Sequence, residues 1–366
     1  MYEPAWAPVF YNPQMTVNRD YSVVGLAALG LNGAVVVDAL SGSGVRALRY
    51  CAEVMGVEKC LANDIDTMAY DLIRRNIELN KLSEKVEAFN EDANILLYKL
   101  KLSGERLDFV DIDPYGSPSP FTRSATWAVA RGGYIGLTAT DLAALSGSRP
   151  WAGSRRYWTS LTATDVPKVV ALRVLLGYAA RVAAELDRYI EPLLYLVGRY
   201  FVRVIYRVRK GASAADAMLA KDVGYLRYCS RCGFRDYVEE VESLICPNCG
   251  SKVKHVGPLW TSSTVYGETV AKARELLLRD FKYLQTYKEL LKVLEYQVAE
   301  AEVRPQIPYD VVHLSSWLGV SSPRVSKVVE CLRSLGYRSV RYYGVPTAIC
   351  TNAPYRDVVS CVKEPS

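Results

Sequence analysis

Short apolar runs alternate with helical stretches between residues 34 and 140 of the chain. The runs that indicate buried strands are Ala34–Asp38, Lys59–Asp64, Val86–Asn90, Leu107–Ile112 and Gly133–Thr140. The stretches that indicate helices are Val45–Met55, Asp66–Asn80, Ala93–Lys101 and Ser117–Ala130. Strands that alternate with helices are typical of a parallel sheet covered by helices. The pattern therefore predicts an α/β fold with a doubly wound parallel sheet.

The flanking segments follow other patterns. Residues 1–20 are rich in Pro and Asn and indicate an ordered lead-in, and residues 21–31 indicate a short helix. Gly, Ser and Pro interrupt the pattern over Leu145–Ser160. A long helix is predicted over Val166–Leu186, and residues 195–210 alternate like a strand.

The remainder of the chain divides into smaller units. They are a cysteine-rich module at 225–257, a helical segment at 266–300 and a unit at 305–366. In the last unit, Leu314–Gly336 predicts helix, turn and helix, and Tyr337–Tyr343 predicts a wing strand. We therefore expect one domain over 1–220 and a second, α+β domain over 221–366 that ends in a winged-helix-like unit.

The composition is that of an ordinary globular protein. Of 366 residues, 50% are hydrophobic and 23% charged, which excludes disorder, collagen and a small disulfide scaffold. The longest uncharged stretch, Tyr21 to Val37, is too short to span a bilayer comfortably, so we expect no membrane helix. The N-terminus lacks the basic start and apolar run of a signal peptide, and the cytoplasm is the expected location.

The charge balance changes this picture slightly. The net charge of +6 leans toward a polyanionic partner such as a nucleic acid. Nothing in the sequence indicates an obligate protein partner.

A glycine-containing turn follows the first predicted strand. In DALSGSGVR, from Asp38, Gly42 and Gly44 allow the backbone to approach a ligand where a Cβ would clash. Asp64 ends the next strand, where a carboxylate can bind a ribose diol. The same spacing fits the dinucleotide pattern G-x-G-x-x-A, with Ala47 in last place, so an NAD enzyme is an alternative at this point.

Two further acidic segments follow the third and fourth strands. Asp92 lies in a loop that is beside the adenine in nucleoside-binding sheets of this kind. DIDPYGSP, from Asp111 to Pro118, stands at the carboxyl end of a strand, where open α/β sheets bind ligands. A carboxylate and a backbone carbonyl there can accept the hydrogens of an exocyclic base amine and direct its lone pair at a methyl sulfonium. The neighbouring aromatic ring can stack on the base.

These segments together resemble a known enzyme family. They are PVFYNPQMTVNRD from Pro8 to Asp20, DALSGSGVRALRY from Asp38, ANDID around Asp64, EDAN around Asp92 and DIDPYGSPSPF from Asp111. In this order they resemble the tRNA (guanine-26, N2)-dimethyltransferases of archaea and eukaryotes. The resemblance covers nearly the whole chain, and its most specific parts are the lead-in and the DPYGSP segment.

The resemblance implies a Rossmann-like methyltransferase domain that takes S-adenosylmethionine (SAM) as methyl donor and tRNA as acceptor. It assigns SAM binding to Arg19, Arg46, Asp64, Asp92 and Ala93. It assigns catalysis to Asp113, and makes Phe10 and Tyr115 the aromatic walls of the guanine pocket.

The chain departs from the family pattern in two places. Tyr115 stands where Phe is common, which still permits stacking. In the last unit, Arg341–Gly344 and Ala348–Thr351 replace a pattern that usually carries His and Lys, which affects the expected RNA contacts rather than the methyl chemistry.

Four of the nine cysteines form two C-x2-C pairs. Cys229 and Cys232 are followed by Cys246 and Cys249. This spacing can bring four thiolates to one tetrahedral ion, so we predict a structural zinc in a zinc ribbon. The remaining cysteines are expected to be buried or free, with a disulfide between some of them as the alternative, and they are Cys51, Cys60, Cys331, Cys350 and Cys361.

Three basic features are candidates for contact with RNA. The loop from Ser146 to Ser160 mixes arginines (Arg149, Arg155, Arg156) with Trp and Tyr residues. A strand with a period of two places Arg203, Arg207 and Arg209 on one face, although a solvated basic face is an equal alternative. The winged-helix-like unit is the third candidate.

The sequence thus predicts methyl transfer from SAM to the exocyclic N2 of guanine 26 in tRNA, giving mono- and then dimethylguanosine. The alternative is a SAM-dependent N-methyltransferase that acts on a different guanine of tRNA or on another RNA. Two other classes of protein are alternatives. One is an NAD-dependent oxidoreductase, which is disfavoured because no catalytic His, Tyr-Lys pair or thiol stands near the sheet edge. The other is a non-catalytic RNA-binding protein with a zinc ribbon and a winged helix.

Overall fold

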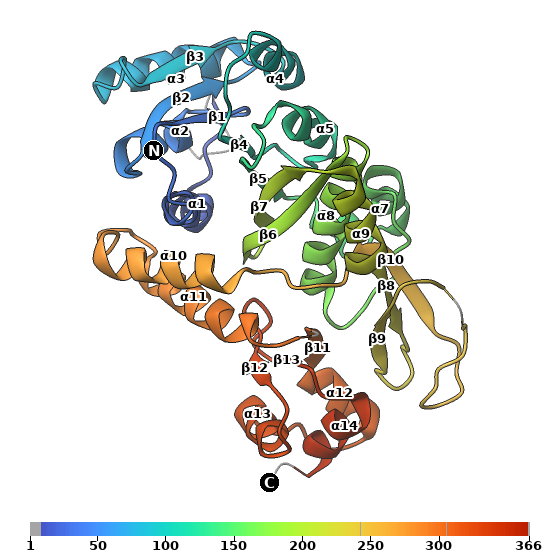
Figure 1. The fold of residues 1–366 in the computed structure, drawn as a ribbon. Helices are drawn as coiled ribbons and strands as arrows, with labels where there is room; N and C mark the ends of the chain where they lie inside the picture. The colour runs from blue at the N-terminus through green and yellow to red at the C-terminus, as the bar shows by residue number, and fades with distance from the viewer. Residues whose placement is uncertain (1–8, 242, 305, 365–366) are drawn as a thin grey trace.

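The computed structural model describes residues 9–241, 243–304 and 306–364. The first part of the expected lead-in, through residue 8, lies outside the described residues, as do positions 305, 365 and 366 of the expected last unit. Figure 1 shows a large sheet with its helices in the first half of the described chain and smaller units in the second half.

The large sheet has seven strands, five of them consecutive and parallel. They are β1 (Ala34–Asp38), β2 (Val57–Asn63), β3 (Val86–Phe89), β4 (Phe109–Ile112), β5 (Tyr134–Ala139), β6 (Arg188–Val197) and β7 (Val202–Lys210). Their order is β3-β2-β1-β4-β5-β7-β6, and β7 runs antiparallel to both of its neighbours. The predicted doubly wound sheet is confirmed, and its order changes direction between β1 and β4, where such sheets bind ligands.

Helices cover both faces of this sheet. One group contains α1 (Thr16–Ala28), α2 (Val45–Glu53) and α3 (Thr67–Leu79), and the other contains α4 (Ala93–Leu102), α5 (Ser119–Ala128) and α8 (Pro167–Ala184). α8 is buried nearly all round because the large sheet and a second sheet both pack against it. A Cβ on Gly177 of α8 would come 2.7 Å from the Leu259 backbone, so glycine permits this close approach.

Several elements differ from the sequence prediction. The first helix starts at Thr16, not at residue 21, because a 3-10 turn over Pro13–Met15, capped by the Asn12 side chain, leads directly into it. The predicted strand over 195–210 is a hairpin, whose strands β6 and β7 are separated at Gly198–Phe201. The interrupted segment after β5 contains two short helices, α6 (Leu142–Leu145) and α7 (Pro150–Tyr157).

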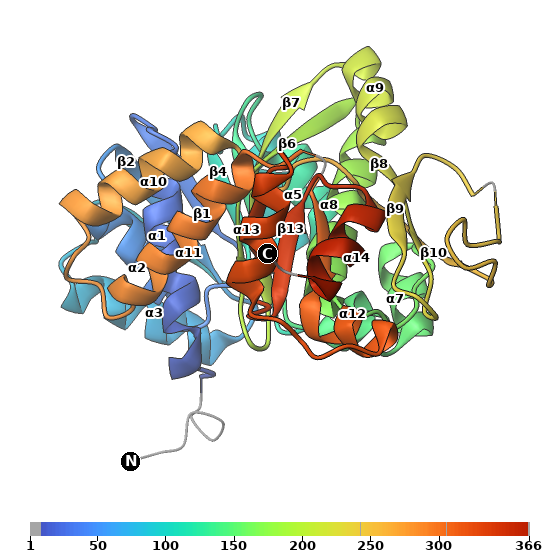
Figure 2. The ribbon, with the colours of Figure 1, turned by 90° about the horizontal axis from the view of Figure 1, so that it is seen from below.

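The second half of the chain contains two small three-stranded sheets. Helix α9 (Ala212–Asp222) leads into β8 (Val223–Tyr228), β9 (Arg235–Val238) and β10 (Lys254–Trp260). The predicted helical segment is a hairpin of α10 (Gly267–Arg279) and α11 (Tyr287–Ala301), and α10 lies along α1 (Figures 1 and 2).

The last unit has the predicted helix–turn–helix and one helix that the sequence did not predict. Its elements are β11 (Ile307–Asp310), α12 (Val311–Leu318), α13 (Val325–Ser334), β12 (Ser339–Arg341), β13 (Ala348–Thr351) and α14 (Tyr355–Lys363). A disulfide between Cys331 of α13 and Cys361 of α14 joins two of the five cysteines that were expected to be buried or free. These thiols can pair because α14 packs against α13.

One hydrophobic core runs through both halves. It extends from α1 and the large sheet into the α10–α11 hairpin and on to Cys350 of β13. Among the described residues, none of the helices combines the length and the apolar character that a membrane crossing requires.

Candidate active site and cysteine cluster

The glycine turn after β1 is fixed to the loops after β2 and β3. Gly44 begins α2 with φ +76°, a conformation that favours glycine, and a Cβ there would lie 3.1 Å from Ile73. Asn63, fully buried at the end of β2, donates to the carbonyls of Ala39 (3.0 Å) and Glu91 (2.9 Å). One amide side chain therefore holds three loops together at the carboxyl edge of the sheet.

The predicted cofactor residues of β2 and β3 lie in these loops. The Asp64 carboxylate accepts from the backbone N–H of Gly42 (2.8 Å) and of Asp66 (3.0 Å), which places it against the glycine turn. Asp92 caps α4 by accepting from the N–H groups of Asn94 and Ile95. Ala93 is buried directly after it, at the first position of α4.

Arg46 of α2 connects the lead-in helix to the loop after β4. Its guanidinium donates to Asn18 Oδ1 (3.2 Å) and Ser22 Oγ (2.7 Å) of α1 and forms an ion pair with the Asp113 carboxylate. Burial alone would lower the pKa of Arg46, but the Asp113 and Asp111 carboxylates raise it overall. Asp113 is thereby held at the edge of the sheet with 14% of its side chain exposed.

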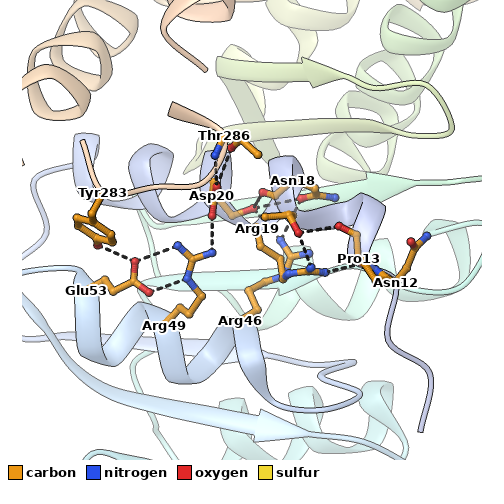
Figure 3. Close-up of polar contacts among 12 residues, drawn as sticks. Asn12, Pro13, Asn18, Arg19, Asp20, Arg46, Arg49, Glu53, Tyr283 and Thr286 are labelled. Atoms are coloured by element: carbon orange, nitrogen blue, oxygen red, sulfur yellow. Dashed lines mark hydrogen bonds and ion pairs between the residues drawn. The ribbon is translucent and has the colours of Figure 1, made fainter. Parts of the chain in front are cut away.

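Arg19 lies near the start of α1 and is held by the lead-in. It donates to the Asn12 carbonyl (3.1 Å), the Tyr11 hydroxyl (3.0 Å) and Thr16 Oγ1 (3.1 Å). Figure 3 shows Arg19 beside Arg46, with both guanidiniums at the junction of lead-in and α2. Burial lowers the pKa of Arg19. The structure thus brings the two predicted cofactor arginines together.

A buried charge cluster behind Asp113 was not predicted from the sequence. Arg203 of β7 donates through both terminal nitrogens to the Asp111 carboxylate (2.8 Å each) and also to Thr138 Oγ1. Tyr50 donates to the same carboxylate at 2.5 Å, and Arg46 Nη1 is 3.7 Å from it. Burial would raise the pKa of Asp111, but Arg203 and Arg46 lower it overall. This cluster fixes Arg46, and through it Asp113.

Asp38 is the member of this region without a hydrogen-bond partner for its carboxylate. It ends β1, is 1% exposed, and neither of its side-chain oxygens has a partner among the described residues. Burial, and then the neighbouring Asp111, raise the pKa of Asp38 to about 7. The buried Asp38 carboxylate, which has no hydrogen-bond donor in the described part of the chain and lies next to a glycine turn, is suited to a ligand that carries positive charge. The sequence signal was present, since Asp38 is the carboxylate before the glycine turn.

The two predicted aromatic walls meet at the mouth of the site. The Phe10 and Tyr115 rings are 5.0 Å apart between centroids in an edge-to-face arrangement, with Phe10 half-exposed and Tyr115 largely exposed. Tyr115 is next to Gly116, which is fixed to the end of β5 by reciprocal contacts with Thr140. The pair therefore offers an open aromatic surface beside Asp113.

Figure 3 shows how the α10–α11 hairpin contacts the helices that carry Arg19 and Arg46. Arg49 of α2 donates to Asp20 of α1 (2.6 Å) and to Glu53 (2.6 Å). From the turn between α10 and α11, Thr286 donates to Asp20 (2.7 Å) and Tyr283 donates to Glu53 (2.7 Å). Asp20 follows Arg19 on α1, and Arg49 lies on the same helix as Arg46. The α10–α11 hairpin is thus joined to neighbours of both arginines.

The four predicted metal ligands come together in the second sheet. The sulfur atoms of Cys229, Cys232, Cys246 and Cys249 all lie within 4.8 Å of one another. Two of the sulfur pairs are 3.6 and 3.7 Å apart, and a tetrahedral zinc with Zn–S bonds of about 2.3 Å requires a separation of about 3.8 Å. The cluster therefore fits a zinc ion in size and in ligand type.

The three arginines predicted on one face of residues 202–209 all have partners within the protein. Arg203 is fully buried in its ion pair with Asp111, Arg207 donates to the Gly132 carbonyl (3.0 Å), and Arg209 pairs with Glu191 (2.9 Å). The period of two is correct, but β7 is an inner strand of the large sheet, so Arg203 is fully buried, whereas the Arg209 side chain remains 41% exposed.

The sheet order and the acidic carboxyl edge together define a Rossmann-like methyltransferase fold. Residues 4–363 match the sequence model of the family described as N2,N2-dimethylguanosine tRNA methyltransferase. The chain belongs to this family.

Named relatives cover nearly the whole chain. It is 36% identical over 363 residues to the tRNA (guanine(26)-N(2))-dimethyltransferases of Sulfurisphaera tokodaii and Saccharolobus solfataricus, covering 99% of this chain and 92% of each relative. Its structure is similar to that of Trm1 from Pyrococcus horikoshii in complex with S-adenosyl-L-methionine, with a TM-score of 0.89, 30% identity, and coverage of 100% of this chain and 97% of the other. These findings favour methyl transfer over the dinucleotide alternative.

Proposed function

We propose that this chain transfers methyl groups from SAM to the exocyclic N2 of guanine 26 in tRNA, giving mono- and then dimethylguanosine. The observation that carries the proposal is the Asp113 carboxylate, held by Arg46 beside the open Phe10–Tyr115 pair at the sheet edge. Membership of the N2,N2-dimethylguanosine tRNA methyltransferase family supports this choice of substrate. The proposal places the enzyme with tRNA in the cytoplasm.

The donor site consists of the three joined loops. When bound there, SAM supplies an electrophilic sulfonium methyl group. Asp64 would accept hydrogen bonds from the ribose hydroxyls, because its carboxylate already faces the glycine turn. Asp92 and the backbone N–H of Ala93, at the first position of α4, would read the amino edge of the adenine. Arg19 and Arg46 complete the site from the side of the lead-in.

The acceptor site consists of Asp113, Phe10 and Tyr115. The N2 lone pair of guanine is delocalised into the ring, so the amine needs a base to become a nucleophile. Asp113 accepts a proton from N2 and orients the lone pair. Phe10 and Tyr115 stack on the extruded guanine and offset part of the few kcal/mol that leaving the base stack costs.

We assign the methyl chemistry to residues 1–220 and tRNA engagement to residues 221–366. In the second region, Cys229, Cys232, Cys246 and Cys249 hold one structural zinc, which would be closed to substrate because the protein supplies all four ligands. The proposal names tRNA as the partner and no obligate protein partner, so the assay combines the purified chain with SAM and tRNA.

Nucleoside mass spectrometry on two tRNA transcripts tests the function. The purified chain should produce N2-methyl- and N2,N2-dimethylguanosine on a transcript with guanine at position 26 and neither product when adenine replaces it. Methylated guanosine on the adenine-26 transcript would favour the alternative, a different guanine of tRNA. Absence of N2-methylated guanosine from both would overturn the proposal.

Variants of Asp113 and Asp64 separate the two half-sites. Asp113→Asn should lower the rate by about 10²–10⁴ and keep SAM affinity near the wild-type value, because this carboxylate faces the acceptor. Asp64→Ala should instead weaken SAM binding by about 1.5–3 kcal/mol, since the ribose loses a charged acceptor. Calorimetry with SAM and single-turnover assays measure both. Full turnover by Asp113→Asn would remove this residue from catalysis.

A further inference from the structure

Helix α7 is fixed to the same loop that carries Asp113 and Tyr115. Its last residue, Tyr157, is fully buried, donates to Asp141 after β5 (2.6 Å) and accepts from Ser117 Oγ (2.8 Å). Arg181 of α8 donates to the carbonyls of Tyr157 (2.7 Å) and Trp158 (2.9 Å). The helix therefore stands as a rigid neighbour of the acceptor site.

The outward face of α7 combines aromatic rings with unpaired cations. Trp151 and Arg155 lie one turn apart on α7, and Arg149 stands just before the helix. Trp158 is the C-cap of the helix, and its ring lies 5.6 Å from that of Tyr178, between centroids. The tryptophans are 79% and 57% exposed. Neither the Arg149 nor the Arg155 guanidinium has an acceptor among the described residues, whereas Arg156 pairs with Asp141.

The charge of this face has one sign. No Asp or Glu occurs between residues 142 and 164, and the two flanking carboxylates are already paired, Asp141 with Arg156 and Tyr157 and Asp165 with Arg235. Exposed tryptophans are uncommon on a surface that contacts only water, while aromatic rings beside guanidiniums suit unstacked bases and phosphates. The chemistry points to a single-stranded or locally opened stretch of nucleic acid.

We propose that the α7 face binds the RNA strand that flanks the target guanine, an inference that rests on the proposed function. Tyr115 and Ser117 belong to one short loop, so a strand whose base reaches Tyr115 continues past the helix that Ser117 contacts. Trp151 stacks on a base next to the extruded guanine. Arg149 and Arg155 contact phosphates on either side of it.

Filter binding of tRNA over a salt series tests the phosphate contacts. The variant Arg149→Ala/Arg155→Ala should reduce the slope of log affinity against log salt by roughly 1.4–1.8, which is two contacts at about 0.7–0.9 each. Arg131→Ala is the matched control, because Arg131 is also an exposed arginine but precedes β5, at the opposite end of that strand. The control should keep the wild-type slope, and SAM affinity should stay the same in all variants.

Trp151 provides the second measurement. Trp151→Ala should weaken tRNA binding by about fivefold to a hundredfold, the range for loss of one base–aromatic stack, and Trp151→Phe should restore most of it because a ring remains. Wild-type slope and affinity in these variants, with normal methylation by the wild type, would reject the α7 face and leave the proposed function standing. Failure of the wild type to methylate N2 would instead reject the function. A change of oligomeric state in sedimentation of Trp151→Ala would make α7 a protein contact and overturn the inference.

Discussion

The charged cluster behind Asp113 and the four-cysteine cluster achieve their geometry in different ways. Asp111, Arg203 and Tyr50 are fully buried at the main hydrophobic core, and both Arg203 and Tyr50 donate hydrogen bonds to the Asp111 carboxylate. The cysteine cluster has a core of its own that consists of little more than the cysteines, Val253 and part of Phe234. Packing can therefore hold the first cluster, whereas the second needs an ion.

This contrast has a consequence for how each site tolerates change. A buried ion pair is held at the cost of desolvation, so losing one partner leaves an uncompensated charge inside the core. Thiolates without a metal repel one another and have too little apolar surface to keep them together. The charged cluster should lose its structure when one side chain is altered, and the cysteine cluster when its metal ion is removed.

Metal removal should produce the largest effect. Structural zinc contributes about 10–16 kcal/mol in small zinc domains, so a chelator or Cys232→Ser should abolish hydrogen-exchange protection around β9 and the second cysteine pair. The large sheet should keep its protection, because its core does not include the ribbon cysteines. Exchange measured by mass spectrometry gives the result, alongside elemental analysis that should find about one zinc per chain.

A thiol outside the ribbon serves as the control for metal content. Cys51→Ala removes a buried thiol of α2, and it should leave the zinc content at the wild-type value. Equal protection of the ribbon with and without metal would contradict the contrast, because packing alone would then hold both clusters.

Arg203→Met should have the next largest effect. The substitution leaves the fully buried Asp111 without its bidentate partner, which should lower the free energy of unfolding by about 3–5 kcal/mol. Urea denaturation measures the loss. The double variant Arg203→Met/Asp111→Asn removes the stranded charge as well, so it should recover part of the stability. Equal losses in the single and double variants would show that shape, not charge, is what Arg203 provides.

The sequence predicted the parts of this site that are local in the chain. The glycine turn, Asp64, Asp92 and the Asp111–Pro118 segment each follow a strand, and parallel strands bring their carboxyl ends to one edge. The role of Arg203 could not be predicted, because alternating arginines look the same on a surface strand and on an inner one. Its partner Asp111 is on β4, and only the insertion of β7 beside β5 brings the two together. Helix α7 was missed because Gly147, Pro150 and Gly153 resemble a loop.

Glu300 of α11 extends the comparison to a buried carboxylate that has no ion-pair partner among the described residues. It accepts from Tyr195 (2.6 Å) and Thr264 (3.3 Å), and burial raises its pKa to about 7. A carboxyl with a raised pKa in the folded state stabilises the protein below its unfolded value near 4.3. That stability is lost as the pH rises through about 7.

Glu300→Gln should therefore gain stability relative to the wild type as the pH rises from 5 to 8, by an amount on the order of 1–3 kcal/mol. Thermal unfolding at both pH values provides the measurement, and Asp38 titrates in wild type and variant alike, so its contribution cancels. A constant difference between the two proteins across this range would show that Glu300 is ionised when folded, as Asp111 is.

Tyr283→Phe should produce the smallest effect, at the contact between the two halves of the molecule. The Tyr283 hydroxyl donates to Glu53, but the residue is 63% exposed, and hydrogen bonds at such sites contribute less than about 1 kcal/mol. Global stability should hardly change. Because Glu53 positions Arg49, and Arg49 contacts Asp20 beside Arg19, SAM affinity should fall by up to about threefold. Calorimetric titration with SAM gives the result, and Tyr266→Phe, an exposed tyrosine at the start of α10, is the control. SAM affinity equal to that of the control would mean that the charged cluster holds the donor site without help from the α10–α11 hairpin.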